Sequence, residues 1–192
     1  RLAWQLRDAD GSLIDAEYDN DVLFWTSGME YREPRVTYRP AEDEYVVTAV
    51  LEDASGLFPR TFLTVTGFDA DGVRLWTHNV PGISTGAVVR TPDIMADTFS
   101  TCCTVVTWKE DWGTVLAQRL DAAGNFQGGT IEVFRDGGRF SDHAFNPRLA
   151  YQRAPRDDFA VVYQKSRGGD SVVQARTIEP LSGALGPERT VA

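Results

Sequence analysis

An internal repeat is the feature that most constrains the fold of this chain of 192 residues. Three segments, 34–38, 92–96 and 147–151, each begin with a proline and continue as a short, mostly apolar run. A denser apolar run follows each of them, at 45–49, 104–108 and 159–163. The prolines are separated by 58 and then 55 residues. Because a repeat of this kind cannot bury its apolar faces alone, neighbouring units must pack on one another.

Each unit continues with two more segments that are joined by a turn. The turn is rich in aspartate and glycine at 69–72 and 121–124, and a looser version follows at 180–183. The same third and fourth segments open the chain, at 4–11 and 12–18. Aspartate bonds nearby backbone and glycine accepts positive φ, so we predict a hairpin at each turn.

Four short strands in a unit of this length indicate a blade of a β-propeller. In the central runs, residues that would point to either face of a strand are apolar. This is typical of strands buried between two neighbouring blades. We find no helical pattern. We therefore predict an all-β, β-propeller-like fold with four-stranded blades, about three and a half of them in one domain. The part-blade covers 1–33 and the blades cover 34–91, 92–146 and 147–192.

The proline-led strand, the dense apolar strand and the segment QRLDAAG at 118–124 resemble the repeats of secreted and cell-surface bacterial propeller proteins. The resemblance extends over nearly the whole chain and implies a secreted or surface location. Its motifs are structural, so it implies no particular activity. The first unit departs from the pattern by an insertion at 51–61, with Leu57 and Phe58 near its tip.

Charge and composition exclude several partners. A net charge of −9 argues against nucleic acid and anionic lipid, both of which need a basic surface. No apolar run is long enough to cross a membrane. We expect the adjacent Cys102 and Cys103 to be two small buried side chains, with a vicinal disulfide as the alternative. Neighbouring Cα atoms lie about 3.8 Å apart, whereas disulfides usually join Cα atoms about 4.4–6.8 Å apart.

No pattern indicates a cofactor or a metal site. The turns containing Asp8 and Asp10, and Asp69 and Asp71, resemble the start of a calcium loop but lack the acidic ligands that should follow. We interpret them as plain hairpin turns. The sialidase Asp-box also fails, because Asp71 and Gly72 are adjacent. A glycosidase would need a pair of carboxylates. The candidates are Glu33, Asp93 and Asp97, which lie near the first strand of a unit.

The connections between blades are where we expect ligand contacts, because they line one face of a propeller. The candidate ligand-binding residues are Trp25, Tyr31, Arg90, Arg139 and His143, together with Trp112 from the loop equivalent to the insertion. Aromatic residues beside charged ones are typical of carbohydrate sites and protein interfaces. The alternative for Trp25 is a plug between blades, and for His143 it is an exposed loop residue.

These features predict a non-catalytic binding or structural module, with a protein or a glycan as its partner. Enzyme activity stays uncertain and is disfavoured, since no catalytic cluster stands out. One alternative is a carbohydrate-active domain with carboxylates at the central channel. Another is a subunit of a homo-oligomer, or part of a larger parent chain, that completes the propeller elsewhere; the part-blade at 1–33 is its support.

Overall fold

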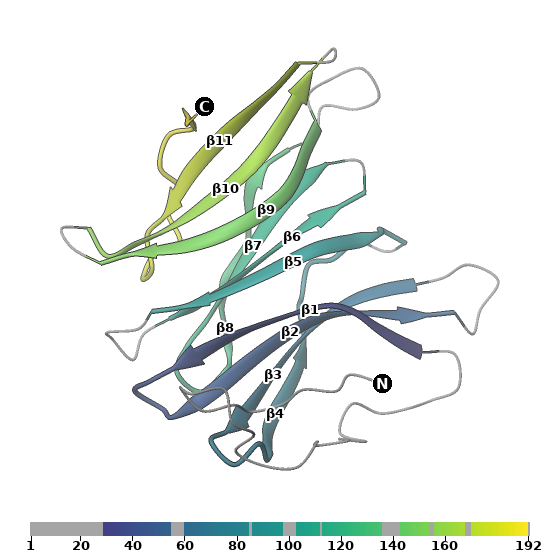
Figure 1. Ribbon diagram of the computed structural model, residues 1–192, viewed down its shortest axis with the longest axis vertical. Coiled ribbons are helices and arrows are strands. Elements are labelled where there is room, and N and C mark those ends of the chain that lie inside the picture. Colours follow the sequence, from purple (N-terminus) through teal and green to yellow (C-terminus); the bar gives the residue numbers. More distant parts are fainter. Residues whose placement is uncertain are drawn as a thin grey trace, which may run out of the picture.

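The structure is a computed structural model, and it describes residues 29–54, 60–84, 86–97, 103–111, 113–135, 143–153, 156–167 and 170–191. These residues form three four-stranded antiparallel sheets and no helix (Figure 1). The all-β, propeller-like fold predicted from the repeat is therefore confirmed. The described part of the chain holds no helix of the length and hydropathy needed to cross a membrane.

Each sheet is an up-and-down meander in chain order, and we call the three sheets blades 1, 2 and 3. Blade 1 consists of β1 (Met29–Arg39), β2 (Glu44–Asp53), β3 (Arg60–Asp69) and β4 (Arg74–Asn79). Blade 2 consists of β5 (Val89–Ala96), β6 (Thr104–Glu110), β7 (Thr114–Leu120) and β8 (Phe126–Phe134). Blade 3 consists of β9 (His143–Gln152), β10 (Asp158–Arg167), β11 (Asp170–Ile178) and β12 (Arg189–Thr190).

The blades pack through their first strands. β5 contacts β1, β2 and β3 of blade 1, and β9 contacts β5, β6 and β7 of blade 2. The three first strands therefore follow one another along the inner side of the molecule, with the sheets fanning outward (Figure 1). This is the arrangement of consecutive propeller blades.

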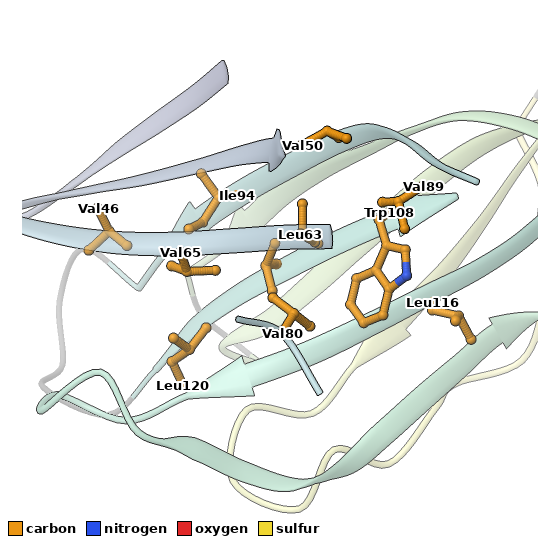
Figure 2. Packing of buried hydrophobic residues seen from close by; sticks show 11 residues of the cluster. Val46, Val50, Leu63, Val65, Val80, Val89, Ile94, Trp108, Leu116 and Leu120 are labelled. Atoms are coloured by element: carbon orange, nitrogen blue, oxygen red, sulfur yellow. The ribbon is translucent and has the colours of Figure 1, made fainter. Parts of the chain in front are cut away.

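Two apolar clusters fill the two junctions. Between blades 1 and 2, Val46, Leu63 and Val65 pack with Ile94 and Trp108 (Figure 2). The second cluster, between blades 2 and 3, is built from Val105, Val115, Ala117, Val133, Leu149, Phe159, Val161 and Tyr163. Blade 2 lies between the other two, which explains why the adjacent Val105 and Val106 are both 0% exposed.

The predicted turns are the outer hairpins of the blades. Gly72, Gly124 and Gly183 have φ of 81°, 80° and 74°, and each amide donates back to the acidic residue that starts its turn. The side chains of those acids accept backbone N–H groups, as when Val73 N donates to Asp69 Oδ1 at 2.7 Å. In blade 3 a glutamate, Glu179, replaces the aspartate and spans one more residue. The looser third copy is thus the same turn with a longer acid.

One sequence expectation needs correction. Cys103 is disulfide-bonded, so the expected reduced side chain is wrong for this residue; Cys102, the other cysteine of the chain, lies outside the described residues. At the two ends of the insertion at 51–61 the chain is strand, because β2 runs to Asp53 and pairs it with Arg60 of β3. Leu57 and Phe58 lie outside the described residues.

Candidate functional site

Each first strand bulges at the residue that precedes its proline. Glu33, Thr91 and Asn146 occupy this place, with φ of 53°, 49° and 49°. The ladder to the second strand shifts register there, between Arg32 and Arg35 in β1 and between Arg90 and Asp93 in β5. The β9–β10 ladder shifts at the same level. Three unrelated side chains thus share one backbone shape.

This shape is strained, and such strain is concentrated at functional sites. A left-handed conformation costs an L-residue about 1–2 kcal/mol, and a following proline disfavours helical conformations further. Thr91 is the least tolerant of the three, since its β-branched side chain crowds the backbone. Bulges are found beside active and binding sites because they redirect side chains. The surroundings of the three bulges are therefore candidates for ligand binding.

Side chains link the bulged strands to one another. The Glu33 carboxylate accepts the backbone N–H of Thr91, and Thr37 Oγ1 accepts that of Ala96 at 3.1 Å. The later residue of β1 bonds to the later residue of β5, so β1 and β5 run in the same direction. These bonds fix the two strands in register.

A comparable bond joins the second and third inner strands. Asp93 Oδ2 accepts the backbone N–H of Leu149 at 2.8 Å, and Leu149 lies two residues after its proline. The starts of β1, β5 and β9 are therefore at one end of three adjacent, parallel strands.

Charged and aromatic groups of blade 1 lie at this end. Arg32 pairs with Glu30 at 2.8 Å and with Glu52 at 3.2 Å, and its guanidinium lowers the pKa of Glu30. Tyr31 is half-buried, and burial raises the pKa of its hydroxyl. Arg90, on the neighbouring strand, is exposed and pairs across the ladder with Lys109.

The junction of blades 2 and 3 contributes a second group. Lys109 Nζ lies 5.0 Å from the centre of the Phe145 ring, and the His143 ring lies 6.3 Å from the same ring. A Cβ on Gly113 would come within 2.7 Å of the Ala144 nitrogen, so the β6–β7 hairpin is pressed against the start of β9. A cation–π contact of this kind contributes roughly 0.5–2 kcal/mol.

We call this set the inner rim: Tyr31, Arg32, Arg90, Lys109, His143 and Phe145. Of the candidates from sequence, Tyr31, Arg90 and His143 lie at the beginnings of β1, β5 and β9. Trp25, Trp112 and Arg139 lie outside the described residues. Sequence reasoning missed Lys109 and Phe145, although Lys109 is one of only two lysines and Phe145 lies two residues before a repeat proline.

Each candidate acid contacts the next blade. Glu33 and Asp93 each accept a backbone N–H of the next blade. Asp97 lies six residues beyond Thr91, beyond the far end of β5, or roughly 20 Å away at 3.3 Å per residue. There it neighbours Tyr151, whose pKa rises to about 12 through burial and a hydrogen bond to Asp97. In the described residues no group of three or more His, Cys, Asp or Glu is placed to hold a metal ion.

Solved structures share this fold. The exo-β-1,3-galactanase of Phanerochaete chrysosporium, determined with galactose, has a TM-score of 0.52 and 14% identity over 86% of this chain and 37% of that chain. An N-acetylgalactosamine deacetylase from F. plautii, in complex with blood group B trisaccharide, has a TM-score of 0.53 and 13% identity over 87% of this chain and 53% of that chain. No family model and no curated protein matches the sequence.

At 13–14% sequence identity, these comparisons show a similar fold and nothing more. This chain spans well under two thirds of the length of either structure. The three sheets are therefore described as consecutive blades of a β-propeller. Both similar structures are of carbohydrate-active enzymes.

Proposed function

We propose that the inner rim is a carbohydrate-binding surface on a propeller module of a secreted or surface protein, and that it binds without catalysing a reaction. The observation that carries the proposal is the set of three bulges, which gathers aromatic, cationic and imidazole side chains at one end of three adjacent strands. The sugars bound in the two structures of similar fold support the choice of a glycan over a protein partner.

The chemistry of the rim suits a sugar. Aromatic rings such as those of Tyr31 and Phe145 offer apolar faces, while Arg90 and His143 supply donors that fix the orientation of hydroxyl groups. The three bulge residues differ, so the blades do not carry three copies of one subsite. A single oligosaccharide that lies across both junctions fits this asymmetry.

The proposal of binding without catalysis rests on the acids. Glu33 and Asp93 already serve as acceptors for backbone N–H groups, and a glycosidase needs two carboxyls about 5–10 Å apart on either side of one bond. The fold neighbours keep a carbohydrate-active enzyme as the second candidate.

Calorimetric titration with galactose, β-1,3-galactotriose and blood group B trisaccharide tests the proposal. We expect one of them to bind, and Phe145→Ala and Arg90→Ala each to weaken binding at least tenfold, which is about 1.4 kcal/mol. Arg135→Ala, which alters an exposed arginine on β8's flank, is the matched control and should leave affinity unchanged. Absence of binding, or equal effects of all three variants, contradicts the proposal, and release of shortened sugars in the same samples favours the enzyme.

A further inference from the structure

The two junctions between blades are built in the same way, and the exposed faces of blades 1 and 3 carry the two halves of a further junction of this kind. In each junction the residue two positions after the repeat proline projects from a first strand into the preceding blade. Ile94 does so in blade 2 and Leu149 in blade 3, and they are 3% and 7% exposed. We call such a first strand the plug of its junction.

The face that receives the plug is equally well defined. In blade 1 it is centred on Val46 and Thr48, and in blade 2 on Val105 and Thr107, all four being 0% exposed. We call this face the socket of a blade. In both sockets these residues lie at equivalent register positions of the second strand.

Blade 3 carries a socket that no described strand fills. The equivalent residues are Ala160 and Val162, and their ladder partners Ala150 and Ala175 share the same face. All four are half-buried or exposed, in contrast to their counterparts in blades 1 and 2. The strands of other blades that contact blade 3 reach it through β9 and the opposite face, which holds Phe159, Val161 and Tyr163.

Within the described residues, no socket receives the plug of blade 1. Val36 lies two residues after Pro34, as Ile94 and Leu149 do after their prolines, yet it is 62% exposed. Tyr38, on the same face of β1, is 40% exposed. Thr66 and Phe68 of β3 on this face are buried, whereas Leu75 of β4 is 55% exposed.

We propose that the free socket of one copy receives the free plug of a second copy, so that two chains close one ring through two equivalent front-to-back junctions. Both halves of the junction exist in one molecule and are built as the filled ones are. Their sizes are complementary: the free plug carries a tyrosine where β5 has Ala96, and the free socket is lined by alanines where blade 2 has Met95 and Val105.

The polar residue at the edge of the free socket is of the kind found in blade 1. Arg148 stands where blade 2 has Asp93 and blade 1 has Arg35. Arg148 Nη1 donates to the Pro147 carbonyl at 2.9 Å, as Arg35 Nη1 donates to the Pro34 carbonyl at 2.8 Å. The partner copy also extends the inner rim, since it places a further first strand beside β9.

Sedimentation equilibrium of the purified chain tests the proposal. We expect a mass of twice 21.3 kDa at saturating concentration. Val36→Glu and Val162→Glu, which put a charge into the plug and the socket, should each weaken association at least tenfold. Val73→Glu is the matched control, because Val73 is exposed to a similar extent, at 59%, in the β3–β4 turn; it should leave the mass unchanged.

A mixture of the two variants gives the decisive result. One junction of the mixed pair joins an unaltered plug to an unaltered socket, so equimolar mixing should restore association that neither variant shows alone. A wild-type chain that stays at 21.3 kDa overturns the proposal, as does a dimer that both variants leave intact. A heavier native polypeptide whose additional sequence covers Val36 and Val162 also overturns it.

The proposal is independent of glycan binding. Val36 lies on the exposed plug strip and outside the inner rim, so its replacement is compatible with a folded monomer. A monomeric chain that binds sugar overturns the dimer and leaves the proposed function standing. A dimer that binds no sugar does the reverse.

Discussion

A buried ion pair between Arg39 and Glu44 lies at the first junction. Their side chains are each 4% exposed, and Arg39 Nη1 lies 2.9 Å from Glu44 Oε2. Arg39 Nη2 also donates to the carbonyl of Ala122 in the next blade at 2.5 Å. Burial raises the pKa of Glu44, although Arg39 and the nearby Trp76 indole pull it down. The pair therefore ties two blades together while keeping a carboxylate in an apolar setting.

Replacement of Arg39 by methionine should destabilise the protein by about 3–5 kcal/mol at pH 7, because Glu44 is left buried without its partner. The folded state holds the Glu44 proton more tightly than the unfolded chain. Its stabilising contribution is therefore full below the ordinary pKa of 4.5 and is lost as pH rises through the folded pKa. The penalty of Arg39→Met should accordingly shrink as pH falls, which urea unfolding at several pH values measures.

Arg135→Met is the control for this prediction. Arg135 pairs with Glu132 at the surface, where its side chain is 75% exposed, and such pairs contribute about 0–1 kcal/mol. Equal losses for the two variants, or a penalty for Arg39→Met that ignores pH, would contradict the explanation.

The left-handed conformation of the bulge residues could not be predicted from the sequence. The prolines at 34, 92 and 147 identified the first strands, yet a residue before proline ordinarily favours an extended conformation. Nothing in the letters Glu33 or Thr91 signals positive φ, and only Asn146 is of a type that tolerates it readily. The strain arises from contacts with the neighbouring blade, which a single unit of the repeat does not reveal.

At the scale of elements, the outer hairpins do more than reverse the chain. The β7–β8 hairpin sits against blade 1, because a Cβ on Gly124 would come within 2.5 Å of the Trp76 ring. The β11–β12 hairpin likewise receives Arg119 of blade 2, which donates to the Pro180 carbonyl at 2.6 Å. Each hairpin is thus also a contact between blades.

Gly124→Ala should therefore destabilise the protein more than a turn substitution alone does. Gly124 and Gly86 have nearly the same φ, 80° and 81°, but a Cβ on Gly86 meets nothing within 4 Å. We expect Gly86→Ala to lose about 1 kcal/mol from backbone strain and Gly124→Ala about 2–4 kcal/mol, since the new methyl also displaces Trp76. Thermal unfolding of both variants measures the difference, and similar losses would show that the hairpin contact contributes nothing.

The strands themselves were predictable and their contacts across blades were not. Apolar runs, prolines and Asp/Gly turns located the twelve strands of the described residues, because each signal is local. The contact of Lys109 with Phe145 joins residues 36 positions apart on different blades, and no local signal reports it. The inner rim was therefore only half visible in the sequence, through Tyr31, Arg90 and His143.

At the scale of the whole molecule, stability should be greatest in the middle. Blade 2 is covered on both faces, whereas the socket of blade 3 is only half-buried. In a linear array each unit is stabilised by its neighbours, so the end units open first. Neither end blade has two described neighbours.

Hydrogen exchange of the Val36→Glu variant checks this without interference from association. We expect amides of β6 and β7 to exchange most slowly, at the rate set by global unfolding, and those of β10 and β11 to exchange faster. Uniform protection across the three blades would contradict the prediction and would mean that they unfold as one unit.

The bulges allow the side chains at the rim to change while the backbone stays the same. The same backbone shape accommodates a glutamate, a threonine and an asparagine, and in each case a proline follows. The backbone shape of the bulge therefore does not depend on which residue occupies it. Each blade therefore has one position at which the side chain can be replaced while the fold is kept. Substitutions at these positions would be the simplest route by which selection could change the ligand.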